Sequence, residues 1–154
     1  MATEWKAMGN GAFKSKDYTR AQAYYSQALQ VLEAPQSCKY SQADLQVLGP
    51  VIATMHVNIA ACYLQNKDAF DCKLCVDHCT KAIQYDPVNV KAWYRRSQAY
   101  AKEKNFASAK QDVLEAIRID PSNAALRTHL EQLKKAASDT LQAEKKSFQK
   151  LFQS

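Results

Sequence analysis

Two groups of side chains in this sequence have types and spacing suited to recognisable chemistry. The first group contains cations and carboxamides in three separate segments: Lys6, Asn10, Asn58, Lys91 and Arg95. Lysine and arginine bind carboxylates through charge-assisted hydrogen bonds, and asparagine donates to the same groups without adding charge. The second group is the thiol cluster Cys72-x-x-Cys75-x-x-x-Cys79 with His78 inside it, which invites a metal or redox interpretation. Either chemistry needs elements that bring these side chains together.

The composition predicts that those elements are helices. The 154 residues include 3 Gly and 4 Pro, far below the average usage of about 7% and 5%. Such a chain cannot supply the closely spaced turns of a β-sandwich or barrel. Apolar residues make up 47% and charged residues 23%, which is typical of a packed protein and not of a disordered one. We therefore expect one all-α domain over residues 1–154.

Targeting signals and cysteine usage favour the cell interior. The first residues lack a basic cluster followed by an apolar stretch, so no secretory signal is predicted. No run approaches the roughly 18 apolar residues of a membrane span. The cysteines number 5, an odd count that does not fit a secreted disulfide framework. We expect a cytoplasmic protein, with the nucleus as an alternative.

The net charge is +6, but the sequence contains no stripe of basic residues interleaved with aromatic ones. No nucleic-acid partner is therefore expected.

Two segments of the chain match each other at fixed offsets. The matched pairs are Trp5 and Trp93, Gly9 and Ser97, Ala21 and Ala109, and Ala28 and Ala116. Small residues at these offsets would let two antiparallel helices approach closely, with the aromatic residues filling the gaps. The pattern resembles the 34-residue tetratricopeptide repeat, in which each repeat is a helix-turn-helix unit. A weaker middle copy carries Ala60 and Cys75 at small positions, and its two halves are out of register by three residues.

The resemblance implies a superhelix of three repeats, with a long C-terminal helix as the seventh. The expected boundaries are repeat 1 at 2–35, a connection at 36–52, repeat 2 at 53–89, repeat 3 at 90–123 and the C-terminal helix at 124–152. Repeat 2 holds a three-residue insertion within Asn66–Asp71, and Pro50 is expected in the first turn of its first helix.

In tetratricopeptide proteins the first helix of each repeat lines a concave groove. The residues at the groove positions here resemble the carboxylate clamp of co-chaperones of this family, including those of FK506-binding and cyclophilin-type immunophilins. The resemblance implies that the clamp consists of Lys6, Asn10, Asn58, Lys91 and Arg95. Further groove residues are candidates for secondary peptide contacts: Phe13, Lys14, Ala61, Gln65, Gln98 and Lys102.

The clamp residues of that family hold the C-terminal Glu-Glu-Val-Asp of Hsp90 and cytosolic Hsp70. The resemblance therefore implies a protein-interaction module with no cofactor and no catalytic residues, to which an isomerase domain could be joined outside this sequence. Two alternatives stay open. The chain could be a tetratricopeptide scaffold for a different protein, or the Cys72-Cys75-Cys79 cluster could have a metal or redox role. Cys75 and Cys79 also occupy core positions of the repeat, which favours structural cysteines and no metal.

The C-terminal segment is predicted to be a capping helix with a basic end. Apolar residues recur every three to four positions, which predicts one packed face: Leu126, Leu130, Leu133, Ala137 and Leu141. Near the end, Phe148, Leu151 and Phe152 are interspersed with lysines. This end resembles the tail of immunophilin-type domains and implies calmodulin or a client protein as a further partner. We expect a monomer.

Overall fold

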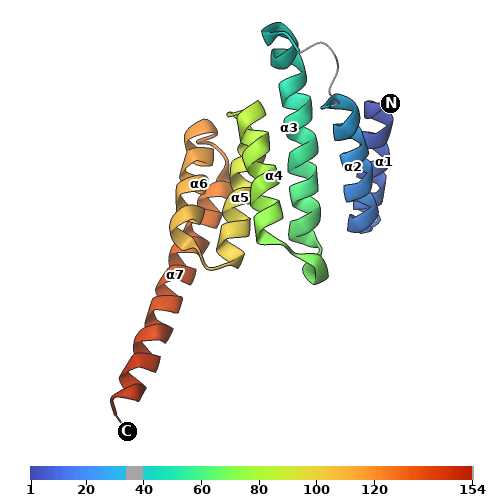
Figure 1. The fold of residues 1–154 in the computed structure, drawn as a ribbon. Coiled ribbons are helices and arrows are strands. Elements are labelled where there is room, and N and C mark those ends of the chain that lie inside the picture. The colour runs from blue at the N-terminus through green and yellow to red at the C-terminus, as the bar shows by residue number, and fades with distance from the viewer. Residues whose placement is uncertain (34–39, 154) are drawn as a thin grey trace.

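The computed structural model describes residues 1–33 and 40–153, and within them it contains seven α-helices and no strand (Figure 1). The all-α prediction is confirmed. The helices are α1 Ala2–Lys14, α2 Tyr18–Leu32, α3 Gln42–Gln65, α4 Cys72–Tyr85, α5 Val90–Lys102, α6 Phe106–Ile119 and α7 Ala124–Leu151. A 3₁₀ turn, η1 at Lys67–Ala69, separates α3 from α4 within the segment predicted to hold an insertion.

Polar residues at the helix starts fix where most of these helices begin. A side-chain oxygen accepts a hydrogen bond from the backbone of the first turn in six helices, at Asp17, Ser41, Asp71, Asn89, Asn105 and Asn123. Each cap satisfies an amide that the helix itself leaves unpaired. The turns inside repeats 1 and 3 are alike, because Lys16 and Lys104 both adopt positive φ, at 61° and 58°.

Small residues bring the two helices of each repeat together. Gly9 of α1 faces the Tyr25 ring of α2 so closely that a Cβ atom would lie 2.6 Å from the ring. The alanines matched between the repeats, Ala21 with Ala109 and Ala28 with Ala116, are fully buried. The successive helices therefore stack as layers (Figure 1). This stacking puts α1, α3 and α5 in position to share one face.

The predicted connection at 36–52 includes the first part of helix α3. Residues 42–52 are helical because Ser41 and Asp44 form a capping box, in which each side chain bonds the backbone of the other. Pro50 consequently lies inside α3 and not in its first turn. A helix that runs through this segment brings Gly49 against the carbonyl of Tyr85, where a Cβ atom would lie 2.8 Å from that oxygen. Residues 36–39 of the connection, with Cys38, lie outside the described residues.

Helix α3 is more apolar than the sequence analysis anticipated. Its 24 residues include an 18-residue window with a mean hydropathy of 1.6. By length and composition alone, this helix could cross a membrane. The structure accounts for this composition, because α3 lies between α2 and α4 and 56% of the window is buried inside the protein. Ile52, Met55 and Ile59 are each 1% exposed in the core.

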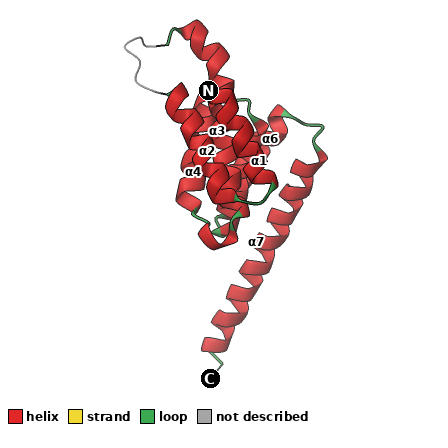
Figure 2. Ribbon diagram, turned by 90° about the vertical axis from the view of Figure 1, so that its right-hand side faces the viewer, coloured by secondary structure: helices red, strands yellow, loops and turns green. Residues whose placement is uncertain are grey.

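Helix α7 caps repeat 3 over only part of its length. Leu126 and Leu133 are buried against α6, and Leu130 packs beside them. Leu141, predicted on the same face, is 52% exposed. The physical reason is length, because α7 has 28 residues and its partner α6 has 14. The second half of α7 projects away from the stack (Figures 1 and 2).

A candidate carboxylate-binding cleft

The helices of all three predicted repeats contribute to one cleft of about 220 Å³. Its lining comes from α1, α2, α3 and α5, and consists of Asn10, Phe13, Lys14, Tyr25, Asn58, Ala61 and Arg95. The structure thus brings together three of the five predicted clamp residues, Asn10, Asn58 and Arg95. Phe13, Lys14 and Ala61, predicted as secondary contacts, line the same cleft.

Arg95 and Lys14 are the charged residues that line this cleft, and Arg95 has no acidic partner among the described residues. Its Nη1 donates to the backbone carbonyl of Val57 on α3 at 2.7 Å. None of the ion pairs found among these residues involves Arg95. Burial lowers the pKa of Arg95 below its usual value, yet an arginine stays protonated at neutral pH. The guanidinium has five N–H donors, so donors beyond the one used by Val57 serve the cleft.

The two amides approach Arg95 from the other repeats. The Oδ1 atom of Asn10 accepts a hydrogen bond of 2.7 Å from the Tyr25 hydroxyl. Asn58 is half-buried on α3, beside Ala61. Burial raises the pKa of Tyr25 to about 12, which keeps this hydroxyl protonated at neutral pH. The cleft therefore presents carboxamide and guanidinium donors, and such a set is suited to an anionic acceptor.

Lys6 and Lys91 are outside the cleft lining. Lys6 is half-buried and lies four residues before Asn10 on α1, whereas Lys91 is exposed and lies four residues before Arg95 on α5. Residues four apart share a helix face, so both lysines stand one turn from the lining on the faces that carry Asn10 and Arg95.

Three predicted secondary contacts do not line the cleft, namely Gln65, Gln98 and Lys102. The ammonium of Lys102 lies 4.8 Å from the centroid of the Phe70 ring, a cation–π arrangement with a residue of the segment between η1 and α4. Gln65 is exposed at the end of α3, and Gln98 is half-buried on α5. Conversely, Tyr25 lines the cleft and was not among the predicted site residues. A tyrosine at a buried aromatic position was the available signal, because a buried phenol needs a hydrogen-bond partner.

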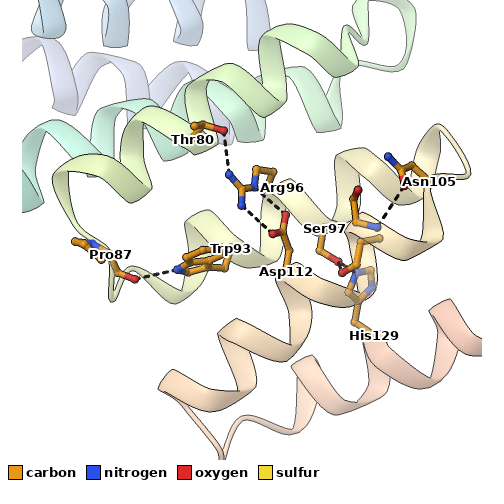
Figure 3. A network of polar contacts seen from close by, with 10 residues as sticks. Thr80, Pro87, Trp93, Arg96, Ser97, Asn105, Asp112 and His129 are labelled. Carbon is orange, nitrogen blue, oxygen red and sulfur yellow. Dashed lines mark hydrogen bonds and ion pairs between the residues drawn. The ribbon is translucent and has the colours of Figure 1, made fainter.

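A polar network on the other side of α5 holds that helix in place (Figure 3). Arg96 makes two bonds of 2.8 Å to the Asp112 carboxylate on α6 and one of 3.0 Å to Thr80 on α4. Ser97 donates to the Ala109 carbonyl at 2.7 Å and contacts His129 of α7 at 2.9 Å. These bonds fix the position of α5 relative to three neighbouring helices, and with it the position of Arg95.

Two of the three thiols of the cluster lie in the interior, and Cys72 is half-buried. Cys75 and Cys79 are fully buried and belong to one core cluster with Ala60 and Ala99. Burial also raises the pKa of Cys62 to about 12. Across residues 1–33 and 40–153, no group of three or more His, Cys, Asp or Glu side chains is arranged to hold a metal ion. Cys75 and Cys79 thus pack in the core where α4 meets Ala60 of α3 and Ala99 of α5.

Known proteins resemble this chain along most of its length. The family described as "Tetratricopeptide repeat" matches residues 90–123, which are the bounds predicted for repeat 3. The mouse peptidyl-prolyl cis-trans isomerase FKBP4 is 28% identical over 96% of this chain and 31% of its own length. The mouse mitochondrial import receptor subunit TOM34 is 30% identical over 88% of this chain and 40% of its own length. The chain thus spans about a third to two fifths of these relatives.

Solved structures share the arrangement of helices. The Hsp90 co-chaperone Cns1 from Saccharomyces cerevisiae superposes with a TM-score of 0.78 at 28% identity, over 99% of this chain and 44% of Cns1. The second TPR domain of human RPAP3, solved in complex with the HSP70 peptide SGPTIEEVD, gives 0.66 at 26% identity, over 87% of this chain and 98% of that one. The chain accordingly contains a tetratricopeptide repeat and adopts the helical fold of tetratricopeptide-repeat co-chaperone domains.

Proposed function

We propose that this chain is a non-enzymatic interaction module that binds the C-terminal Glu-Glu-Val-Asp of Hsp90, Hsp70 or both. One observation carries the proposal. Asn10, Asn58 and Arg95, which come from three different repeats, line a single cleft whose arginine has no acidic partner among the described residues. Arg95 is half-buried, a partly buried cation without a counter-ion is costly, and a ligand carboxylate would supply that counter-ion.

The similar proteins support the same partner class. Cns1 is described as an Hsp90 co-chaperone, and the RPAP3 domain is solved with an HSP70 peptide that ends in Glu-Glu-Val-Asp. A chain that ends in aspartate carries two carboxylates within a few ångströms of each other. Asn10, Asn58 and Arg95 would donate to these oxygens, and Lys6 and Lys91 would add charge at the rim. Each charge-assisted bond contributes roughly 1.5–3 kcal/mol, so the five residues together would make a selective site for a free C-terminus.

Titration with two peptides tests the proposal. One peptide ends in Glu-Glu-Val-Asp, and the other has the same sequence with an amidated C-terminus. We expect binding of the free acid to be at least about tenfold tighter, because amidation removes one carboxylate and its bonds. Lys91→Ala should weaken binding of the free acid, whereas Lys110→Ala should not. Lys110 is the matched control because it is an exposed lysine on α6, away from the cleft. Equal affinity for both peptides would contradict the proposal.

We also propose a second interaction at the end of α7, with calmodulin or an acidic client surface. Phe148, Leu151 and Phe152 are 63%, 75% and 74% exposed, and they lie among Lys145, Lys146 and Lys150. An exposed helix with apolar and basic residues suits an acidic groove. Replacement of Phe148 and Phe152 by serine should abolish binding to calcium-loaded calmodulin and leave binding of the Glu-Glu-Val-Asp peptide unchanged. Retained calmodulin binding by this variant would contradict the assignment.

The assembly and location proposed with this function are a monomer in the cytoplasm. Light scattering during size exclusion tests the first statement, since a monomer has a mass of 17.3 kDa. Microscopy of the tagged full-length protein tests the second. Fluorescence at the mitochondrial surface would overturn the proposed cytoplasmic location. This alternative is included because TOM34 is named as a mitochondrial import receptor subunit.

A further inference from the structure

The carboxamide of Asn10 can serve a carboxylate in only one of its two orientations. A carboxylate accepts hydrogen bonds and donates none, so Asn10 must turn its NH₂ group toward the ligand and its carbonyl away. Asn10 is exposed on α1, and nothing in an isolated helix would select one orientation over the other. The cleft therefore needs a group that recognises the carbonyl of Asn10.

Tyr25 has the position and chemistry to do this. Its hydroxyl donates to Oδ1 of Asn10 at 2.7 Å, across the interface between α2 and α1. Its ring is 2% exposed and lies against Gly9, where a Cβ atom would come within 2.6 Å of it. The phenol therefore cannot swing away, and its pKa, raised to about 12 by burial, keeps the donor proton in place.

We infer that Tyr25 is a positioning residue that holds the Asn10 carboxamide with its NH₂ group facing the ligand carboxylate. The inference rests on the proposed function and adds a specific role for a residue of the second helix of repeat 1. With its carbonyl engaged by Tyr25, Asn10 presents two N–H donors and no competing acceptor to the cleft. The hydroxyl thus acts on the ligand through Asn10, and the ring keeps its separate role in packing.

Tyr25→Phe removes the hydroxyl and keeps the ring, which makes it the decisive variant. We expect about 3- to 10-fold weaker binding of the free-acid Glu-Glu-Val-Asp peptide, which corresponds to the loss of one neutral hydrogen bond. Tyr24→Phe is the matched control. Tyr24 is the preceding residue of the same helix, stacks on Trp5 with ring centroids 5.9 Å apart and does not line the cleft. Its variant should bind the peptide as tightly as the unaltered chain.

A double-mutant cycle separates positioning from packing. In the Asn10→Ala background, Tyr25→Phe should change the affinity less than twofold, because the group it positions is gone. An equal loss with and without Asn10 would mean that the hydroxyl acts through the fold, and it would overturn the inference. Unchanged affinity of the single Tyr25→Phe variant would also overturn it. If the unaltered chain binds free-acid and amidated peptides equally, the proposed function itself fails, and the two failures are therefore distinguishable.

A second measurement needs no variant at position 25. The side-chain NH₂ signals of Asn10, assigned by their absence in Asn10→Ala, should shift on titration with the free-acid peptide and stay near their starting positions with the amidated one. If the Asn10 NH₂ signals do not shift at saturation with the free-acid peptide, the inference is overturned. This readout holds even if Tyr25→Phe fails to fold.

Discussion

Arg95 and Arg96 are neighbours on α5 with opposite surroundings. Arg96 is enclosed by partners, with two bonds of 2.8 Å to Asp112, one to Thr80 and the Trp93 ring 5.0 Å from its guanidinium carbon. Arg95 makes one bond, to the Val57 carbonyl, and otherwise faces the cleft. Adjacent residues of a helix point about 100° apart, so one serves the interior of the stack and the other its open face. The arginine without a carboxylate is the one suited to a ligand.

Removal of Arg96 should give the largest effect, and the effect should fall on stability. Asp112 is 4% exposed, so Arg96→Ala would leave a buried carboxylate without its counter-ion. Such losses cost about 3–5 kcal/mol of the free energy of unfolding. Urea denaturation checks this value. A loss below about 1 kcal/mol would mean that the Arg96–Asp112 pair does not hold α5 against α6.

Removal of Arg95 should weaken peptide binding and leave stability nearly unchanged. Arg95→Ala deletes a cation that has no acidic partner among the described residues, so the free energy of unfolding should change by less than about 1 kcal/mol. Binding of the Glu-Glu-Val-Asp peptide should weaken by about 1.5–3 kcal/mol, the value of a charge-assisted bond. Denaturation and calorimetric titration of the same sample measure both quantities. A variant that loses stability and keeps its affinity would reverse the roles of the two arginines.

His56 and His78 do not line the cleft, and their ring nitrogens are partners of each other, in contrast to Arg95. Nδ1 of His56 lies 2.9 Å from Nδ1 of His78, and its Nε2 lies 3.2 Å from the Glu33 carboxylate. Burial lowers the pKa of His56, and burial together with His56 and Lys81 lowers the pKa of His78 to about 4. The Tyr85 hydroxyl, also on α4, donates to Glu33 at 3.1 Å. At neutral pH both imidazoles are therefore uncharged.

This arrangement predicts that stability falls in mild acid. The unfolded chain takes up a proton on His78 near pH 6.5, whereas the folded chain binds it only toward pH 4, and the lowered pKa of His56 acts in the same direction. Stability is therefore complete above pH 6.5 and is lost as the pH falls toward 4. We expect a loss of about 1–2 kcal/mol between pH 7.5 and 5.5. Urea titrations at several pH values check this, with His78→Gln as the variant in which the loss should shrink. A constant free energy of unfolding over this range would contradict the prediction.

Removal of the projecting end of α7 should have the smallest effect on stability and on peptide binding. Residues 141–153 are exposed, so a chain that ends at Thr140 gives up little buried surface. Its free energy of unfolding should fall by less than about 0.5 kcal/mol, and its affinity for the peptide should not change. A thermal melt and one titration suffice. A large loss of either quantity would show that this end contacts the stack.

Sequence patterns predicted the fold well where small residues are obligatory. The spacing of Gly9, Ala21 and Ala28, repeated as Ser97, Ala109 and Ala116, follows from the close approach of two helices, and the structure buries all six. The helical run at 42–52 was missed because the capping pair Ser41 and Asp44 is a weak, local signal. The exposure of Leu141 was missed for another reason. Helical periodicity reports which face a residue occupies and says nothing of how far the neighbouring helix extends.

The candidate site was predictable in its members and less so in their arrangement. Repeat positions identified Asn10, Asn58 and Arg95, which line one cleft. The same positions could not separate the lining from the rim, where Lys6 and Lys91 stand, because long side chains reach different depths from equivalent backbone sites. Lys102 was assigned to the peptide, whereas its ammonium lies over Phe70. The hydroxyl of Tyr25 shows why such details need a structure, because its partner is 15 residues away.

The most direct test of the cleft is a ratio of two dissociation constants. The ratio compares the amidated with the free-acid Glu-Glu-Val-Asp peptide, and it is measured by calorimetry for the unaltered chain and for Arg95→Ala. If Arg95 is one of the groups that bind the terminal carboxylate, the ratio should be at least about 10 for the unaltered chain and should be smaller in Arg95→Ala. A ratio near 1 for the unaltered chain, or an undiminished ratio in Arg95→Ala, would contradict the account.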